Sequence, residues 1–226
     1  MKSIVIHWQP KLVEFINNHV QALATTPPYK FSESDFQRAA YDHLLKVMPL
    51  EECVAVEESL SIYLDDKYSK WKALDLRIHT PMKSRKYLFE LKKAYKPNNN
   101  SIEEVIEDLI RLALISKLDN KSSYCFFLLC GDKSVIEDFL NDENISSILP
   151  KPSKAIFSDE KCYHSGMPKI IKDADREAAI RLKLDGIAVR LIQHEIGTNN
   201  QTILFQVSDK IEKFNESIAY TFEIAD

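Results

Sequence analysis

The stretch from Trp71 to Lys92, WKALDLRIHTPMKSRKYLFELK, contains two short runs in which apolar and polar residues alternate. The first run covers 71–79 and the second covers 86–92. Alternation with a period of two is typical of β-strands whose two faces meet different environments. A short connection through Thr80 to Lys83 would join the two strands. The stretch therefore predicts an antiparallel hairpin.

The apolar faces of the two runs fix how the strands pair. Leu74, Leu76 and Ile78 share one face of the first run, and Tyr87, Phe89 and Leu91 share one face of the second. Registers that match these faces put Asp75 on the same side as Glu90 and Lys92, and the most symmetric register puts Asp75 directly across from Glu90. Two facing carboxylates repel unless a cation lies between them. Mg²⁺ would suit this position, because it binds through one or two carboxylates and keeps several waters.

The bulk composition indicates one folded domain with extensions. The chain has 226 residues, of which 45% are hydrophobic and 28% are charged. No apolar run is long enough for a membrane span, and the N-terminal apolar stretch is too short and too polar for a secretory signal. Four cysteines occur without a CxxC pair, and Cys125 and Cys130 lie in an apolar run that predicts a buried strand. We therefore expect reduced thiols, a cytoplasmic location and no membrane partner.

The distribution of charge is more informative than the net charge of −4, which gives no indication of nucleic-acid binding. Residues 83–96 hold Glu90 as their single acid against six basic residues: Lys83, Arg85, Lys86, Lys92, Lys93 and Lys96. This density fits either a solvated hairpin tip or a basic rim that contacts a phosphate backbone, and charge alone does not separate the two. Lys83, Arg85, Lys86 and Lys93 are the candidates for nucleic-acid contact.

Periodicity predicts the remaining elements. Helices are expected over 10–24, 34–47, 102–118 and 173–182, with a short helix that ends near residue 140. Strands are expected within 54–64, over 122–130, and as a hairpin over 187–194 and 201–207. Residues 145–170 are expected to be mostly loop. Ser32 and Asp35 have the spacing of a capping box, and Ser101 is the expected cap of its helix.

The order of these elements predicts an α/β fold in which a mixed sheet is flanked by helices. We divide the chain into an N-terminal helical extension (1–30), a core (31–142) and a C-terminal addition (143–226) that packs on the core. The three parts are expected to form a single domain.

Around the hairpin the chain resembles the PD-(D/E)xK nuclease superfamily, whose motif is an Asp on one strand and Asp/Glu-x-Lys on the next. The matching residues are Leu74-Asp75 and Glu90-Leu91-Lys92, with fourteen residues between the two acids. The helices expected before and after these strands fit the family pattern, and the resemblance covers about residues 32–140. Leu74 departs from the proline of the motif. Asp/Glu-x-Lys also occurs at 65–67, 119–121 and 159–161, where the sequence is polar and turn-like.

The resemblance implies a restriction-endonuclease-like fold and magnesium-dependent cleavage of DNA, in a restriction, defence or mobile-element setting. Asp75, Glu90 and the backbone carbonyl of Leu91 would bind Mg²⁺, for which Mn²⁺ would substitute. Lys92 would orient the attacking water or steady the transition state. Such enzymes cut both DNA strands by pairing two sites, so a homodimer is expected.

Many members of this superfamily add an acid from the first helix of the fold. Glu33 is the candidate for that position here, because it lies on the same helical stripe as Phe36, Ala40 and Leu44. The competing interpretation is a helix-terminus acid that the helix macrodipole favours. Glu58, on the preceding strand, is the alternative catalytic acid.

Three other interpretations compete with a nuclease. The charged side chains could form a polar sheet face with cross-strand ion pairs, Arg77 with Glu90 and Asp75 with Lys92, worth about 0.2–1 kcal/mol each. The fold could also be a catalytically inactive module that binds nucleic acid or protein. In the third interpretation the charged face contacts a partner protein.

Overall fold

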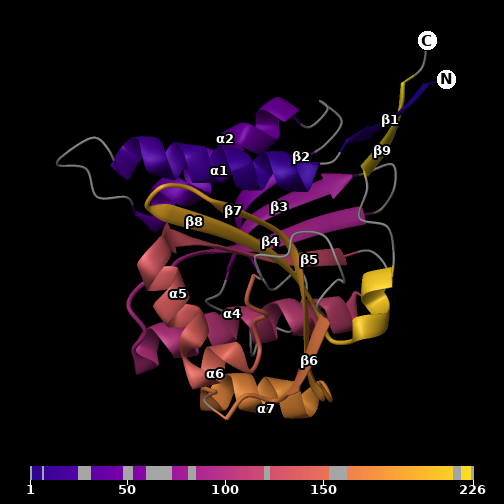
Figure 1. Cartoon of the computed structure of the whole chain (residues 1–226). Coiled ribbons are helices and arrows are strands. Elements are labelled where there is room, and N and C mark those ends of the chain that lie inside the picture. The colour runs from indigo at the N-terminus through magenta and orange to yellow at the C-terminus, as the bar shows by residue number, and fades with distance from the viewer. Residues whose placement is uncertain are drawn as a thin grey trace.

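The structure, a computed structural model, describes residues 2–6, 8–24, 32–47, 53–59, 73–80, 85–119, 123–152, 162–169, 171–215 and 220–224. Their backbone forms a mixed β-sheet with helices on both faces (Figure 1). The expected α/β class, with a mixed sheet flanked by helices, is therefore confirmed.

In the described part of the chain, the main sheet has seven strands in the order β2-β3-β4-β5-β8-β7-β6. They are β2 (Cys53–Ser59), β3 (Ala73–Thr80), β4 (Arg85–Lys93), β5 (Ser123–Asp132), β6 (Cys162–Gly166), β7 (Gly186–Ile196) and β8 (Asn200–Ser208). Strands β4 and β5 run parallel, whereas the other neighbouring pairs of this sheet are antiparallel. A parallel pair needs a long crossover, which helix α4 (Asn99–Leu118) provides.

The helices divide between the two faces of this sheet (Figure 1). Helices α1 (Trp8–Ala24) and α2 (Glu33–Val47) cover one face. The other face carries α4, α5 (Lys133–Asn141), α6 (Glu143–Ser146) and α7 (Asp173–Arg181). Each face has its own buried apolar cluster, so the sheet lies between two cores. None of the described helices is both long and apolar enough to cross a membrane.

Strands β3 and β4 follow the predicted alternation with one exception. Leu76, Ile78, Tyr87 and Phe89 all pack into the core beneath α1 and α2. Leu74 was predicted to share their face, but it packs into the core beneath α4. Leu74 lies beyond the Leu76–Phe89 pair, where β3 separates from β4, although it still pairs in register with Glu58 of β2.

Strand β5 is buried from Tyr124 to Gly131, as expected for a strand covered on both faces. Cys125 and Cys130 within it are buried and free, which confirms the expected reduced thiols at these two positions. Burial raises the pKa of Cys130 to about 12 and the pKa of Cys125 still higher. Both thiols therefore stay protonated at neutral pH and are unreactive.

Local hydrogen bonds explain where two of the helices begin. At the start of α2, the Ser32 backbone N–H donates to Asp35 and the Asp35 N–H donates to the Ser32 hydroxyl, which confirms the predicted capping box. Helix α4 begins differently from the prediction. Its N-cap is Asn98, which accepts from the Ser101 N–H, while the Ser101 hydroxyl is the reciprocal partner within the helix. Asn is at least as good an N-cap as Ser, and it lies three residues earlier.

Helix α1 is joined to the sheet by a buried polar contact. The Asn17 side-chain oxygen accepts from the Asn200 side-chain nitrogen at 2.9 Å and from the Thr202 hydroxyl at 3.3 Å. The backbone carbonyl of Asn17 also accepts from Asn200, at 2.8 Å. All three side chains are buried, so these bonds replace water that the groups would otherwise bind.

Replacing Asn17 with alanine is expected to destabilise the protein by about 1–3 kcal/mol, because the Thr202 hydroxyl loses this acceptor and Asn200 keeps only one of its two. Urea denaturation measures the change. The matched control is Asn18→Ala, since Asn18 is the exposed neighbour on the same helix. Equal losses in the two variants would show that the buried contact contributes nothing.

Two features of the sheet were not expected from the sequence. Residues 162–166 lie in a segment expected to be mostly loop, yet they form β6 at the edge of the main sheet. Strands β1 (Lys2–Ile6) and β9 (Tyr220–Ile224) pair antiparallel in a separate two-stranded sheet, which brings the two ends of the chain together (Figure 1). The residues of β6, β1 and β9 carry only a weak strand pattern of their own. Each strand is stabilised by pairing with a strand that lies far away in the sequence.

Candidate functional site

The candidate site lies where β3 and β4 separate. The two strands pair from Thr80 opposite Arg85 to Leu76 opposite Phe89, and β4 then continues to Lys93 beside β5. One more step of the same register would put Asp75 opposite Glu90, which is the register predicted from the apolar faces. The Asp75 carboxylate instead bonds the strand itself: its Oδ2 accepts from the backbone N–H of Leu91 at 2.6 Å. Asp75 is thus held against the residues of the Glu-x-Lys motif.

Helix α2 adds two side chains to this opening of the sheet. The Gln37 amide donates to Oδ1 of Asp75 at 2.5 Å, so both oxygens of that carboxylate accept a hydrogen bond. Oε2 of Glu33 accepts from the Lys93 backbone N–H at 3.2 Å and lies 3.8 Å from Nζ of Lys92. Glu33, predicted from the sequence as the helical acid, is therefore beside the motif lysine.

Helix α4 contributes three charged side chains that the sequence analysis did not single out. Glu104 lies 3.0 Å from Lys92, between Oε2 and Nζ. Arg111 contacts Asp108, one turn earlier on the helix. It also contacts Glu90, with 3.2 Å between Nη1 of Arg111 and Oε1 of Glu90. Their spacing of four and three residues puts all three on one helical stripe, a pattern that is present in the sequence.

Burial perturbs the acids of the site. It raises the pKa of Glu90 well above its ordinary value, and the nearby Asp108 carboxylate adds to the effect. Burial likewise raises the pKa of Asp108 to about 7 and raises the pKa values of Asp75 and Glu33. For Lys92 burial acts to lower the pKa, but the surrounding carboxylates, Asp108 first, outweigh it and raise the pKa. Such a group of perturbed acids in one place is typical of functional sites.

The site carries more potential negative charge than positive charge. Five carboxyl groups meet two cations here: Glu33, Asp75, Glu90, Glu104 and Asp108 against Lys92 and Arg111. Oε1 of Glu90 is buried and has no hydrogen bond, although Arg111 is close to it. An added hard cation would supply the missing partner, and Asp75 with Glu90 and the carbonyl of Leu91 is a donor set that fits Mg²⁺. Among the described residues, no group of three or more Asp, Glu, His or Cys side chains is arranged to hold a metal ion.

The other predicted residues lie outside this group. Lys86 pairs with Asp119 at 3.0 Å, and Nζ of Lys93 lies 5.4 Å from the centre of the Tyr95 ring. Lys83 and the side chains of Arg85 and Glu58 fall outside the part of the chain that the structure describes.

The ion pairs of the site differ from the cross-strand pairs considered from the sequence. Glu90 is paired with Arg111 from α4, and Lys92 is paired with Glu104 and Glu33. The charged residues of β4 are thus paired with side chains from α2 and α4, which lie on opposite faces of the sheet.

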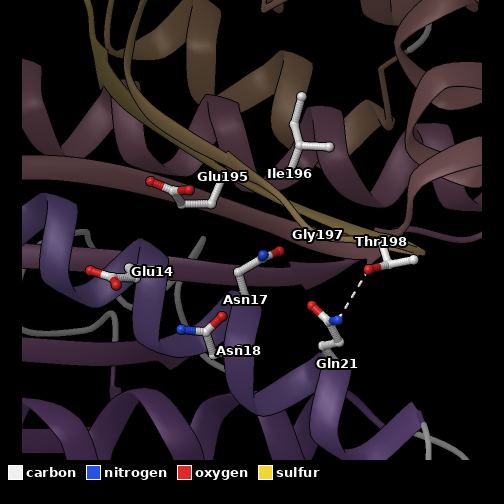
Figure 2. A pocket seen from close by; sticks show the side chains of 8 residues that line it. All are labelled: Glu14, Asn17, Asn18, Gln21, Glu195, Ile196, Gly197 and Thr198. Atoms are coloured by element: carbon white, nitrogen blue, oxygen red, sulfur yellow. Dashed lines mark hydrogen bonds between the residues drawn. The ribbon is translucent and has the colours of Figure 1, made fainter.

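A second concave surface has a different character. A polar groove separates α1 from the turn between β7 and β8, and Figure 2 shows the side chains that line it: Glu14, Asn17, Asn18, Gln21, Glu195, Ile196, Gly197 and Thr198. The Gln21 amide donates to the Thr198 hydroxyl across it at 3.3 Å. These eight residues include two acids and no Lys or Arg, so the groove does not suit a phosphate backbone.

Comparison of the chain with protein-family models, with curated proteins and with solved structures finds no match.

Proposed function

We propose that the protein is a metal-dependent DNA endonuclease with a restriction-endonuclease-like fold. The observation that carries the proposal is the hydrogen bond from the Leu91 N–H to Asp75, at the point where β3 separates from β4. It holds the first acid of the motif beside Glu90-Leu91-Lys92, and it joins two residues that are sixteen positions apart in the sequence. The arrangement of α2, three antiparallel strands, the α4 crossover and a parallel β5 supports the same proposal.

Asp75, Glu90 and the carbonyl of Leu91 would hold Mg²⁺ or Mn²⁺ at this opening. When bound, the ion lowers the pKa of a coordinated water and offsets charge on the scissile phosphate. Gln37 positions Asp75 by donating to Oδ1. Glu33 anchors the end of β4 through the Lys93 N–H, and together with Glu104 it holds Lys92. The ammonium group of Lys92 is then placed to orient the water or to bind the phosphate oxygen.

The DNA would reach the site along the basic part of β4 and the connection before it. Lys83, Arg85, Lys86 and Lys93 remain the proposed contacts with the phosphate backbone. A homodimer remains part of the proposal for cleavage of both strands, and sedimentation at several protein concentrations would show a particle of twice the chain's mass.

The test is nicking of supercoiled plasmid DNA by the purified protein. We expect conversion to the open circular form with Mg²⁺ or Mn²⁺, and no conversion after removal of divalent ions with EDTA. Restoring Mg²⁺ in excess over EDTA should restore the reaction. Nicking that continues unchanged in EDTA would contradict the metal-dependent mechanism.

A catalytically inactive module with the same fold is the second candidate, and the Arg111 contact with Glu90 favours it. In that case the guanidinium of Arg111 supplies the positive charge that a metal ion would otherwise supply. The protein then binds DNA in a gel-shift assay equally well with Mg²⁺ or with EDTA. Supercoiled plasmid stays uncut in both conditions.

A further inference from the structure

Arg111 lies among the acids of the candidate site as a largely covered cation. Its side chain is 12% exposed, and those of Glu90 and Asp108 are 4% and 9% exposed. One guanidinium nitrogen, Nη1, faces Glu90, and the other, Nη2, bonds Asp108. Arg111 and Asp108 are on the same helix, whereas Glu90 belongs to β4. The guanidinium therefore links α4 to the second acid of the motif.

The contacts of Arg111 with Asp108 and with Glu90 differ in quality. The contact with Asp108 is a direct hydrogen bond between neighbours on one helical turn. The contact with Glu90 is an ion pair at 3.2 Å that leaves Oε1 without a hydrogen bond. A buried carboxylate oxygen that has charge nearby but no aligned donor is incompletely satisfied. Arg111 therefore satisfies Glu90 incompletely, whereas its hydrogen bond to Asp108 holds the guanidinium on α4.

We propose that Arg111 is the internal counter-ion of the site, which neutralises Glu90 while no metal is bound and which a divalent cation must displace. This inference rests on the proposed function and adds the regulation of metal affinity to it. In the metal-free protein Arg111 keeps the acidic cluster folded. On metal binding Glu90 turns to the ion, and Asp108 retains the guanidinium as a positioning residue. Arg111 thus lowers the affinity of the site for the ion, and it stabilises the folded protein when no ion is bound.

Two readouts that do not require DNA test the inference: calorimetric titration with Mn²⁺, and thermal unfolding with and without Mn²⁺. We expect Arg111→Met to bind Mn²⁺ at least about tenfold more tightly, because one competing positive charge is removed from the cluster. In EDTA the same variant should unfold roughly 5–15 °C lower than the wild type, because two buried acids lose their cation. Mn²⁺ should raise its unfolding temperature by more than it raises that of the wild type.

Arg38→Met is the matched control. Arg38 lies on α2, is 85% exposed and pairs with Asp42 on the surface. Its removal takes away the same charge from the chain but not from the site, so both the Mn²⁺ affinity and the unfolding temperature should stay close to those of the wild type.

The outcomes separate this inference from the proposed function. If Arg111→Met and the wild type bind Mn²⁺ equally, and Asp75→Asn abolishes binding, the counter-ion role is wrong and the metal site stands. If neither protein binds Mn²⁺, the proposed function fails and Arg111 is a permanent cation. If Arg111→Met does not fold, the double variant Arg111→Met/Asp108→Asn removes one charge of each sign, and it should fold and bind Mn²⁺ more tightly than the wild type. Binding no tighter than the wild type in that variant overturns the inference.

Discussion

Replacing Lys92 with methionine is expected to slow magnesium-dependent nicking of plasmid DNA by about 10²–10³-fold, the usual effect of removing one preorganised charge from an active site. The side chain of Lys92 is 15% exposed and is held between Glu33 and Glu104. Its ammonium group pairs with these two acids and not with Glu90. Methionine keeps an unbranched apolar chain only one atom shorter and removes the terminal ammonium group, so the result reports mainly on that group rather than on packing.

Lys46→Met is the control for this prediction, because Lys46 is an exposed lysine in the last turn of α2 and lies outside the site. Its nicking rate should match that of the wild type. Mn²⁺ affinity should not fall in Lys92→Met, since the carboxylates that would hold the ion are unchanged. Wild-type nicking by Lys92→Met would remove Lys92 from the mechanism, whereas loss of Mn²⁺ binding would show that the substitution had disturbed the metal ligands.

The hairpin and its register could be predicted because short alternating runs fix which residues share a face. Pairing Leu76 with Phe89 and Ile78 with Tyr87 buries both apolar faces at once, and the structure has this register. The approach of Asp75 to the Glu90-x-Lys92 motif follows from it. Leu74 shows the limit of the rule, because it packs into the core beneath α4 at the point where β3 has separated from β4, although it still pairs with Glu58 of β2.

The contribution of α4 was missed for a different reason. The periodicity of its apolar residues predicted the helix and its buried face, and it assigned no role to the polar residues. Asp108 is nevertheless buried and the Arg111 side chain is only 12% exposed, because the two pair with each other and Arg111 also contacts Glu90 on β4. The spacing of Glu104, Asp108 and Arg111 marks a charged stripe. Nothing in the spacing says that this stripe meets the end of β4, which depends on how the crossover helix packs on the sheet.

The core that supports the site depends strongly on one aromatic residue of β5. Replacing Phe127 with alanine is expected to destabilise the protein by about 3–5 kcal/mol, the usual cost of removing a buried phenylalanine ring. Phe127 is fully buried, pairs in register with Glu90 on β4 and with Phe205 on β8, and its ring centre lies 6.4 Å from that of Phe205. Urea denaturation measures the change in the free energy of unfolding.

Because Phe127 lies beside Glu90 in the sheet, the loss should appear in function as well as in stability. The cavity left by the ring borders the strand that carries the motif, so at a temperature where Phe127→Ala is still folded we expect weaker Mn²⁺ binding than in the wild type. Ile180→Ala is the control, since Ile180 is 72% exposed on α7 and its truncation should change stability by no more than about 0.5 kcal/mol. A loss below about 1 kcal/mol in Phe127→Ala would mean that the core closes around the missing ring. The sheet between the two cores would then be more adaptable than its burial indicates.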